Sequence, residues 1–567
     1  MQNCAHCSAT FEVTQEDLTL LDKLSPIIGG KKQQLPPPTL CPDCRQQRRC
    51  TFRNERKLYH RKCDKSGKQM VSMYAPDSPF TVYHPQEWWS DGWDPFSYGK
   101  DFDFSRPFFE QYAELMREVP RASLFGKNNE NSDFTNHTDN AKNCYMCMDT
   151  GNSQDTYYSK WMINTKDCCD CYQLEKSEWC YESQYSVNLH DAVYCFLCDQ
   201  CSNVAFCYDC VDCHDCILSC HMRHKRFCIF NEQLTEDEYR KRRKELNLNV
   251  WTVFKEVQKK YEEMRLQTFH RPTIVMFSEQ SSGDFVYHCN NVHYSYGVIE
   301  SQDCTYCYDA GFLRDCMDCY EPAFDCELQY EAHACNRGKY LISASVCYDV
   351  HNCFYCDSCH NSKNLFGCIG IKSGNYCILN KQYSKEEYEI LVPKIIAHMR
   401  KTPLRSSDGS FAGQEWGEFF PSSISPFTYN ESLAQDYFPL SKEQVLAHKW
   451  QWRDEEDESQ KYLGPPVVIA DDIAMVDGKL TSQILRCEVT ERLYKIIPQE
   501  LAFYKKIGVP VPRTCPDQRH KERLARTNPR RLFDRSCAKC KKAIRSTFAP
   551  DRPEIVYCEE CYLASVY

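Results

Sequence analysis

Cysteines in the middle of the chain recur at every twelfth position. Cys195, Cys198 and Cys201 are followed by Cys207 and its neighbours at the same spacing, and the register returns further along the chain. Its later members are Cys210, Cys213, Cys304, Cys307, Cys316, Cys319, Cys335, Cys347, Cys356, Cys359 and Cys368. A short period without a long helical pattern is typical of chains that stack strands in successive coils. The sequence therefore predicts a mixed, mainly β fold with β-solenoid-like repeats in two cysteine-rich halves, 134–232 and 273–382. Each coil would use one such period or another multiple of six.

The two halves end alike and pass into helices. The first closes on CIFNEQLTEDEY and the second on CILNKQYSKEEY. Both segments contain a capping box, Thr235 with Glu238 and Ser384 with Glu387, which predicts the start of a helix. We expect a helical connector at 233–272, outside the repeat, and a helix at 383–402.

The two ends of the chain are copies of one module. The N-terminal end reads TLCPDCR, then NERKL, then YAPDSP, and the C-terminal end reads RTCPDQR, then NPRRL, then FAPDRP. The spacing agrees too, because Cys44 to Cys63 and Gln518 to Cys537 are both 19 residues apart. We predict related zinc-ribbon modules at 1–100 and 481–567.

Each module has room for two four-ligand metal sites and retains one of them. The intact sets are Cys4, Cys7, Cys41 and Cys44 at one end, and Cys537, Cys540, Cys558 and Cys561 at the other. Two CxxC pairs complete a tetrahedral set of thiolates, the donors of structural zinc. The other two sets are Cys63, Ser66, His84 and Glu87, and Cys487, Thr490, Cys515 and Gln518. Sets with so few thiolates suit zinc poorly. We therefore expect about two Zn²⁺ per chain.

Composition and the remaining segments point to a cytoplasmic protein. The chain has 567 residues, a net charge of −10 and 40 cysteines. It contains no apolar run long enough for a transmembrane helix, and its first residues lack a signal pattern. Cytosolic thiols stay reduced, so we expect metal ligands and buried thiols rather than disulfides. A helical connector at 101–133 and a linker at 403–480, with the acidic run Asp454–Glu458, would join the modules to the repeats.

A basic stretch follows the cysteines of each module. Residues 45–68 hold ten Lys or Arg and two acids, and residues 519–545 hold eleven and two. In a helix after Cys44, several of these arginines would share one face. Nucleic acid, RNA or DNA, is the favoured partner, contacted through its phosphate backbone. The candidate contact residues are Arg45, Arg49, Arg53, Arg56, Arg523, Arg526, Arg530 and Arg531. The alternatives are a solvated face, pairing with the protein's own acidic surface, and a protein partner; no membrane contact is expected.

The many mid-chain cysteines have two interpretations. A small thiol fills a narrow coil well, so a structural role is favoured. Rows of thiols could instead hold soft metals or buffer redox changes. Histidines among the cysteines, such as His214 and His224, keep a metal role open. The aromatic clusters EWWSDGWDPF and FFPSSISPFTY could be binding platforms, but we interpret them as residues that cap a core or brace a domain junction.

No catalytic motif stands out. The chain lacks GxGxxG, P-loop, GxSxG and HExxH patterns, and a four-thiolate zinc site leaves no open position for water. The sequence therefore favours a non-enzymatic scaffold or binding protein, with a thiol-rich metal-binding or redox-buffering protein as the alternative. A pocket between the halves would be needed for an enzyme.

The segments TLCPDCR, VYCEECY and CILNKQYSKEEYE resemble an uncharacterised family of cysteine-rich, zinc-ribbon-bearing proteins of candidate-phyla-radiation (Patescibacteria) bacteria. The resemblance covers nearly the whole chain. It implies zinc ribbons at the ends and a cysteine-rich repeat between them, and it implies no particular activity. The chain departs from the family pattern at Ser66, His84, Glu87, Thr490 and Gln518.

Overall fold

The computed structural model describes residues 1–314, 317–318, 326–327, 330–331, 335–336, 347–404, 415–454, 462 and 464–567. The chain divides into two compact units, and each unit joins an end module to the cysteine-rich half that lies further from it in sequence. Unit 1 contains Met1–Ser123, Thr273–Arg453 and Arg530–Leu532. Unit 2 contains Leu124–Pro272, Asp454–Pro529 and Phe533–Tyr567.

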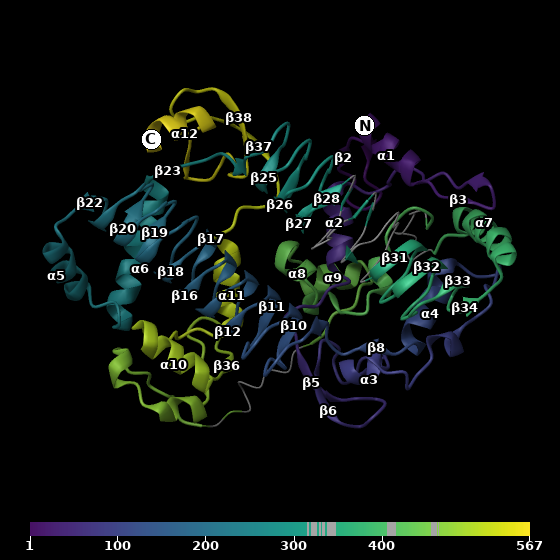
Figure 1. Ribbon diagram of the computed structural model, residues 1–567, viewed down its shortest axis with the longest axis horizontal. Coiled ribbons are helices and arrows are strands. Elements are labelled where there is room, and N and C mark those ends of the chain that lie inside the picture. The colour runs from purple at the N-terminus through teal and green to yellow at the C-terminus, as the bar shows by residue number, and fades with distance from the viewer. Residues whose placement is uncertain are drawn as a thin grey trace. The chain divides into compact units, whose positions relative to one another are not determined.

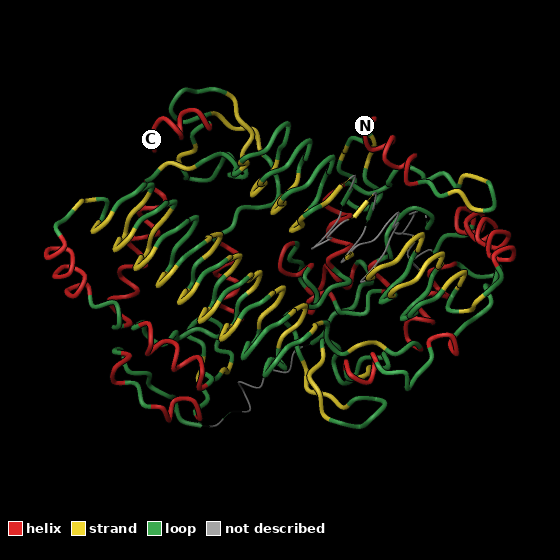
Figure 2. Tube along the Cα trace, viewed as in Figure 1, coloured by secondary structure: helices red, strands yellow, loops and turns green. Residues whose placement is uncertain are grey.

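The cysteine-rich half of unit 2 forms two parallel sheets, here named the first ladder (Figures 1 and 2). One sheet has the order β17-β15-β13-β11-β10-β9 and the other β12-β14-β16-β18-β19-β20-β21-β22. The bounds are β9 (Gly126–Lys127), β10 (Thr135–Asp139), β11 (Cys147–Gly151), β12 (Gln154–Tyr157), β13 (Lys160–Ile163), β14 (Lys166–Cys169), β15 (Tyr172–Glu175), β16 (Glu178–Tyr181), β17 (Gln184–Val187), β18 (His190–Val193), β19 (Ser202–Tyr208), β20 (His214–Cys220), β21 (Arg226–Ile229) and β22 (Glu232–Gln233).

Neighbouring strands of the first ladder pair in parallel with a constant register, except at its end, where β22 pairs antiparallel with β21. Cys168 lies beside Cys180, twelve positions later, and Val204 lies beside Cys216 at the same interval. Between β11 and β18 the chain visits the two sheets in turn, so it returns to each sheet after one such interval. The spacing between cysteines and the offset between paired strands are therefore both twelve residues. Of the multiples of six that the sequence left open, this offset is the one that the structure has.

The backbone of the first ladder also has a period of three. From His137 to Phe230 every third residue has a positive φ, as at Asn140, Asn143 and Met146. From Thr138 to Ser219 the residue after each of these is buried, and these residues are mainly Cys, Ser, Thr, Ala and Val, with Leu or Met at a few steps. Four left-handed residues in each step of the ladder bend the chain tightly enough to leave only a narrow interior. Asn and Asp are frequent at these positions because they tolerate the left-handed conformation better than most residues.

The second ladder, in unit 1, pairs most of its described strands in parallel at the same interval of twelve, with an interval of 11 in one pair and 13 in another. Its strands are β24 (Val275–Met276), β25 (Gly283–Tyr287), β26 (Ser295–Ile299), β27 (Tyr308–Gly311), β28 (Leu313–Arg314), β29 (Cys326–Glu327), β30 (Cys335–Asn336), β31 (Cys347–Phe354), β32 (His360–Phe366), β33 (Asn375–Ile378) and β34 (Lys381–Gln382). Cys335 pairs with Cys347, and Leu365 pairs with Cys377. Two members of the predicted register, Cys316 and Cys319, lie outside the described residues.

Helices cover the last strands of both ladders. α5 (Glu236–Leu246) and α6 (Trp251–Gln267) follow the first, and α7 (Lys385–Lys401) follows the second. Both predicted capping boxes are present, at Thr235 and Ser384. On α6, Phe254, Val257 and Tyr261 are buried in a core cluster with ladder aromatics such as Phe206. The segment predicted as a helical connector, 233–272, therefore contains two helices.

The end modules share one order of elements. The N-terminal module has β1 (Gln2–Asn3), β2 (Thr10–Phe11), α1 (Gln15–Leu24), α2 (Pro42–Cys50), β5 (Tyr59–Lys62), β6 (Gln69–Ser72), β7 (Val82–Tyr83) and α3 (Pro85–Trp89), with a small hairpin, β3 (Ile27–Ile28) and β4 (Lys31–Lys32), inserted. The C-terminal module has β35 (Leu485–Arg486), β36 (Leu493–Tyr494), α10 (Pro498–Ile507), α11 (Pro516–Ala525), β37 (Phe533–Ser536), β38 (Ala543–Ser546), β39 (Ile555–Val556) and α12 (Glu559–Val566). The order agrees with the duplication read from the sequence.

The two predicted connectors are packed rather than extended where they are described. Segment 101–133 contains α4 (Phe108–Glu118), β8 (Arg121–Ala122) and β9, and Phe108, Phe109 and Tyr112 are buried. In the predicted linker at 403–480, Phe419 and Phe420 are buried as well, and short helices include α8 (Ala434–Tyr437) and α9 (Lys442–Ala447). Most of the acidic run, residues 455–458, lies outside the described residues.

Candidate metal centres and their supporting contacts

The first candidate metal centre lies in the N-terminal module. The sulfur atoms of Cys4, Cys7, Cys41 and Cys44 all lie within 4.8 Å of one another. The β1–β2 hairpin carries the first two cysteines, and the start of α2 carries the other two. Cys41 is the residue that caps α2, and its backbone N–H donates to Cys4 Sγ at 3.3 Å. Its pKa is lowered to about 5, chiefly by the hydrogen bond from the Cys44 thiol, so one thiolate forms readily.

The second candidate metal centre lies in the C-terminal module. The sulfur atoms of Cys537, Cys540, Cys558 and Cys561 also lie within 4.8 Å of one another. The β37–β38 hairpin and the start of α12 carry these residues. Burial raises the pKa of the Cys537 thiol, but backbone N–H groups of Cys540 and Cys558 outweigh it and lower the pKa to about 6. Four sulfur donors at these separations suit a tetrahedral metal ion and leave it no open position.

All four cysteine knuckles, including those of the incomplete sets, have the same backbone. In each, the first cysteine accepts a hydrogen bond from the N–H four residues later, and that later residue has a positive φ. The four pairs are Cys4 with Ser8, Cys63 with Gly67, Cys487 with Glu491, and Cys537 with Lys541. The knuckles of the incomplete sets thus keep the backbone conformation of the intact ones, which supports the interpretation of the incomplete sets as lost sites.

The side chains of the incomplete N-terminal set are engaged elsewhere. Cys63 Sγ accepts from the backbone N–H groups of Ser66 at 3.5 Å and His84 at 3.3 Å. His84 caps α3 through Nδ1, and Glu87 pairs with Lys65 at 3.2 Å. In the described part of the chain, the two intact sets are the groups whose donors converge as a metal requires.

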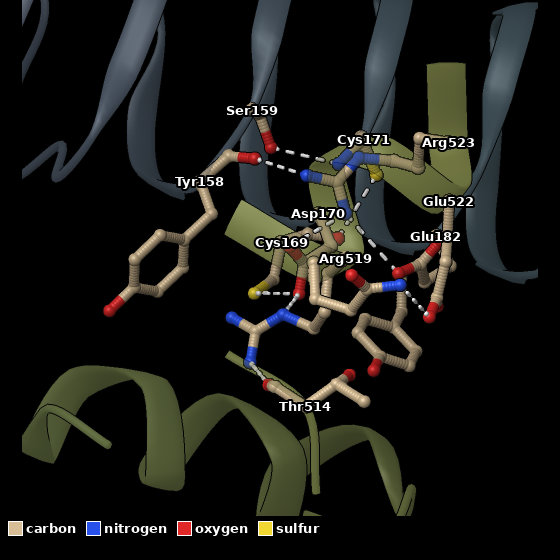
Figure 3. A network of polar contacts seen from close by, with 12 residues as sticks. Tyr158, Ser159, Cys169, Asp170, Cys171, Glu182, Thr514, Arg519, Glu522 and Arg523 are labelled. Atoms are coloured by element: carbon tan, nitrogen blue, oxygen red, sulfur yellow. Dashed lines mark hydrogen bonds and ion pairs between the residues drawn. The ribbon is translucent and has the colours of Figure 1, made fainter. Parts of the chain in front are cut away.

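The basic helix of the C-terminal module is docked on the first ladder (Figure 3). Arg519 and Arg523 of α11 approach one carboxylate, that of Asp170, with Nε of Arg519 at 2.9 Å and Nη1 of Arg523 at 2.7 Å. Asp170 is fully buried, and both arginines are at most 3% exposed. Arg523 also reaches Glu182, which lies beside Asp170 on the next step of the ladder, at 3.2 Å. The two carboxylates raise the pKa of Arg523, although burial alone would lower it.

The basic helix of the N-terminal module is docked on the second ladder in the same manner. Arg45 and Arg49 of α2 are buried, and both form ion pairs with Asp318. Arg48 lies between them and pairs with Glu331 at 2.6 Å. Arg45 and Arg49 occupy the same positions after the CPDC or CPDQ segment as Arg519 and Arg523. Asp318 and Asp170 both have a positive φ, so one docking geometry is used twice.

These contacts change the interpretation of the basic stretches. The candidate nucleic-acid residues Arg45, Arg49 and Arg523 are buried against carboxylates of their own chain, so they have no surface to offer a phosphate. These three arginines therefore pair with acidic residues of their own chain, which is one of the alternatives that the sequence left open. Because α2 ends at Cys50, Arg53 and Arg56 do not share its face.

The remaining candidate arginines are placed differently from one another. Arg53 is buried and pairs with Glu55 at 2.7 Å. Arg526 pairs with Glu182 at 2.9 Å, and Arg530 pairs with Asp309 while its guanidinium lies 4.1 Å from the Tyr437 ring. Arg56 is half-buried and Arg531 is exposed. Sequence reasoning missed the buried acceptors Asp170 and Asp318, because they lie far along the chain from the arginines that they bind.

The ladder cysteines act as hydrogen-bond donors. Cys195 Sγ donates to the carbonyl of Val193 at 3.6 Å and to that of Val204, on the next step, at 3.7 Å. Ser183 occupies an equivalent position and donates to Tyr181 and Ala192 in the same pattern. A thiol and a hydroxyl therefore fill equivalent inward positions with the same pattern of contacts. This geometry agrees with the structural interpretation of these cysteines.

No protein-family model matches the chain, and no curated protein matches it significantly. The resemblance to the Patescibacteria family stays a prediction. In the described part of the chain, no helix is both long and apolar enough to cross a membrane.

Proposed function

We propose that this protein is a non-enzymatic zinc-binding scaffold. The observation that supports the proposal is the pair of four-cysteine groups, each of which brings four sulfur donors within 4.8 Å. All-sulfur tetrahedral sites of this kind are the usual structural sites of zinc, and their full coordination leaves no place for a substrate. Each ion would hold a hairpin knuckle to the start of a helix, as in a zinc ribbon.

We further infer that the two ladders are β-solenoids and serve as the body of the scaffold. The parallel pairing of most strands at an interval of twelve residues and the inward-facing small side chains support this inference. Each ladder also supplies the buried Asp to which one end module is fixed. The surfaces left for partners would then be the exposed faces of the ladders and of the knuckles.

A nucleic-acid partner remains a proposal for the exposed basic side chains alone. The C-terminal knuckle presents Lys539, Lys541 and Lys542 to solvent, next to the second metal centre. Phosphate contacts would make binding fall steeply as salt rises, and replacing these lysines by Ala would weaken binding to unrelated sequences equally. Absence of salt-dependent binding to RNA and DNA would leave a protein as the expected partner.

The alternative function is a thiol-rich store of soft metal or reducing equivalents. Its support is the number of cysteines, 40 in all. The ladder thiols, however, already donate to carbonyl oxygens on their own and the next step. A store would take up many ions per chain, whereas a scaffold would take up two.

Removal of the metal tests the scaffold directly. A strong zinc chelator should unfold the two knuckle regions, because structural zinc supplies folding energy to small modules, while the ladders keep their protection from hydrogen exchange. Uniform loss of protection throughout the chain, or no loss at the knuckles, would contradict the proposal.

A further inference from the structure

The incomplete set of the C-terminal module retains cysteine at two of its four positions. Cys487 lies on the knuckle between β35 and β36, and Cys515 caps the start of α11. The backbone N–H of Glu488 donates to the carbonyl of Arg513 at 3.1 Å, which joins the two segments, and the Thr490 hydroxyl lies 3.6 Å from Cys515 Sγ. In the N-terminal module the equivalent pair, Cys4 and Cys41, has its sulfur atoms within 4.8 Å.

The surroundings of Cys487 favour its thiolate. Burial raises the pKa of Cys487, but the Thr490 hydroxyl and backbone N–H groups of Cys515, Thr490 and Val489 outweigh it and hold the pKa below the ordinary thiol value. These donors are what remains of a metal knuckle. A thiolate is the nucleophile in thiol oxidation and exchange.

The site is buried but close to solvent. Cys487 is 1% exposed and Cys515 4%. The residues around the first thiol, Arg486, Glu488 and Thr490, are all exposed. A small oxidant therefore has to cross only a thin layer of protein, unlike at the ladder thiols of the interior.

We propose that Cys487 and Cys515 form a reversible disulfide, which takes the place of the metal that this set has lost. With a peroxide as oxidant, the Cys487 thiolate attacks one oxygen of hydrogen peroxide, the O–O bond breaks, and hydroxide leaves with the shared electron pair. The resulting sulfenic acid is then attacked by the sulfur of Cys515, which loses its proton, and the S–O bond breaks as water departs. Two thiols and one peroxide thus give one disulfide and two waters.

The disulfide would tie the β35–β36 hairpin to the first turn of α11. This helix carries Arg519 and Arg523, which dock the module on Asp170. Oxidation would therefore fasten the docked helix more firmly, since a cross-link restricts the unfolded chain. The inference is independent of the proposed scaffold role and of zinc at the intact sets.

The chain contains a matched control in Cys63. This residue sits on an equivalent knuckle, and the Ser66 hydroxyl and backbone N–H groups of His84 and Ser66 lower its pKa against the effect of burial. Ser66 and His84 stand where ligands would be, and no cysteine does. Cys63 should thus react with peroxide but find no partner within its own set.

Mass spectrometry of the full-length, zinc-loaded chain tests the proposal. The protein is treated with hydrogen peroxide, free thiols are blocked, and the chain is digested without reductant. A peptide joining Cys487 to Cys515 is expected, and it should disappear on treatment with dithiothreitol. In the Cys515→Ser variant, Cys487 should instead be trapped by dimedone as a sulfenic acid. Cys63 should be trapped in the same way in the unaltered chain.

Two results would overturn the proposal. One is that Cys487 and Cys515 both remain open to alkylation under conditions in which Cys63 has been oxidised. The other is that Cys487 becomes linked to a cysteine other than Cys515. The unaltered chain gives both readouts, so the test does not depend on the folding of the variant.

Discussion

Replacement of Asp170 by Asn should loosen the C-terminal module from the first ladder. Asp170 is fully buried, accepts a hydrogen bond from Arg523 and forms an ion pair with Arg519 of the same helix, α11. Its φ of 55° is one that Asn tolerates. The substitution thus removes the charge and leaves the backbone conformation accessible.

The expected loss follows from burial. Arg519 retains Glu500 at 3.0 Å and Arg523 retains Glu182 at 3.2 Å, but two buried guanidinium groups would then share fewer carboxylates. Removing one partner of a buried ion pair costs about 3–5 kcal/mol. Because each 1.4 kcal/mol is a factor of ten, protection of the α11 amides should fall roughly 100- to 4,000-fold.

Hydrogen exchange read by mass spectrometry measures this protection in α11 without assuming two-state unfolding of the whole chain. Asp215→Asn is the matched control, since Asp215 also has a positive φ on the first ladder. Asp215 lies 3.9 Å from Arg243, and both side chains are partly exposed. The control should change stability by less than about 1 kcal/mol. Equal and small effects of the two substitutions would refute the idea that the buried Asp holds the module.

Three further results are expected. Cys558→Ser should lose one metal ion and unfold the C-terminal knuckle, whereas Cys63→Ser should leave the metal content unchanged; equal losses in metal analysis would contradict the assignment of sites. Cys198→Ser should be tolerated, because serine can donate to the carbonyls that Cys198 reaches, whereas Cys198→Leu should overpack the interior and cost about 1–3 kcal/mol or more, measured by chemical denaturation. Glu415 is buried and accepts backbone N–H groups at the start of α4, and burial raises its pKa to about 7. Since this pKa lies above that of an unfolded glutamate, the native state loses stability as pH rises from about 4.5 to about 7. Glu415→Gln should remove up to about 3 kcal/mol of this change in stability with pH, and denaturation midpoints at several pH values would measure the effect. An unchanged pH profile would show that Glu415 does not titrate in this range.

The metal groups could be predicted from sequence because a CxxC knuckle is a local structure. Cys537 and Cys540 lie on one tight turn whose backbone hydrogen bonds join close neighbours in the chain. The second pair, Cys558 and Cys561, repeats the same CxxC spacing a short distance further along the chain. Nothing beyond spacing and donor type was required, and the four sulfur atoms do converge.

The docking of the basic helices could not be predicted in the same way. A run of arginines looks alike whether its charges face water, a nucleic acid or a buried carboxylate. Arg45 is buried because it pairs with Asp318, and Arg519 is buried because it pairs with Asp170. In both pairs the two residues lie far apart in the sequence. Long-range pairing of this kind leaves no local signal in a single sequence.

The three-residue period was present in the sequence but hidden by substitution. Cys207, Cys210, Cys213 and Cys216 display it openly. Elsewhere Ser, Thr, Ala and Val occupy the same inward positions, Ser183 being one example. A search for small residues of any kind at every third position, rather than for cysteine alone, would have found it.

The zinc content of the purified chain tests the central claim most directly. Elemental analysis after dialysis against a weak chelator should give two zinc ions per chain, one for each intact four-cysteine group. A content well above two would favour the thiol-rich store, and the absence of bound zinc would contradict the zinc-stabilised scaffold.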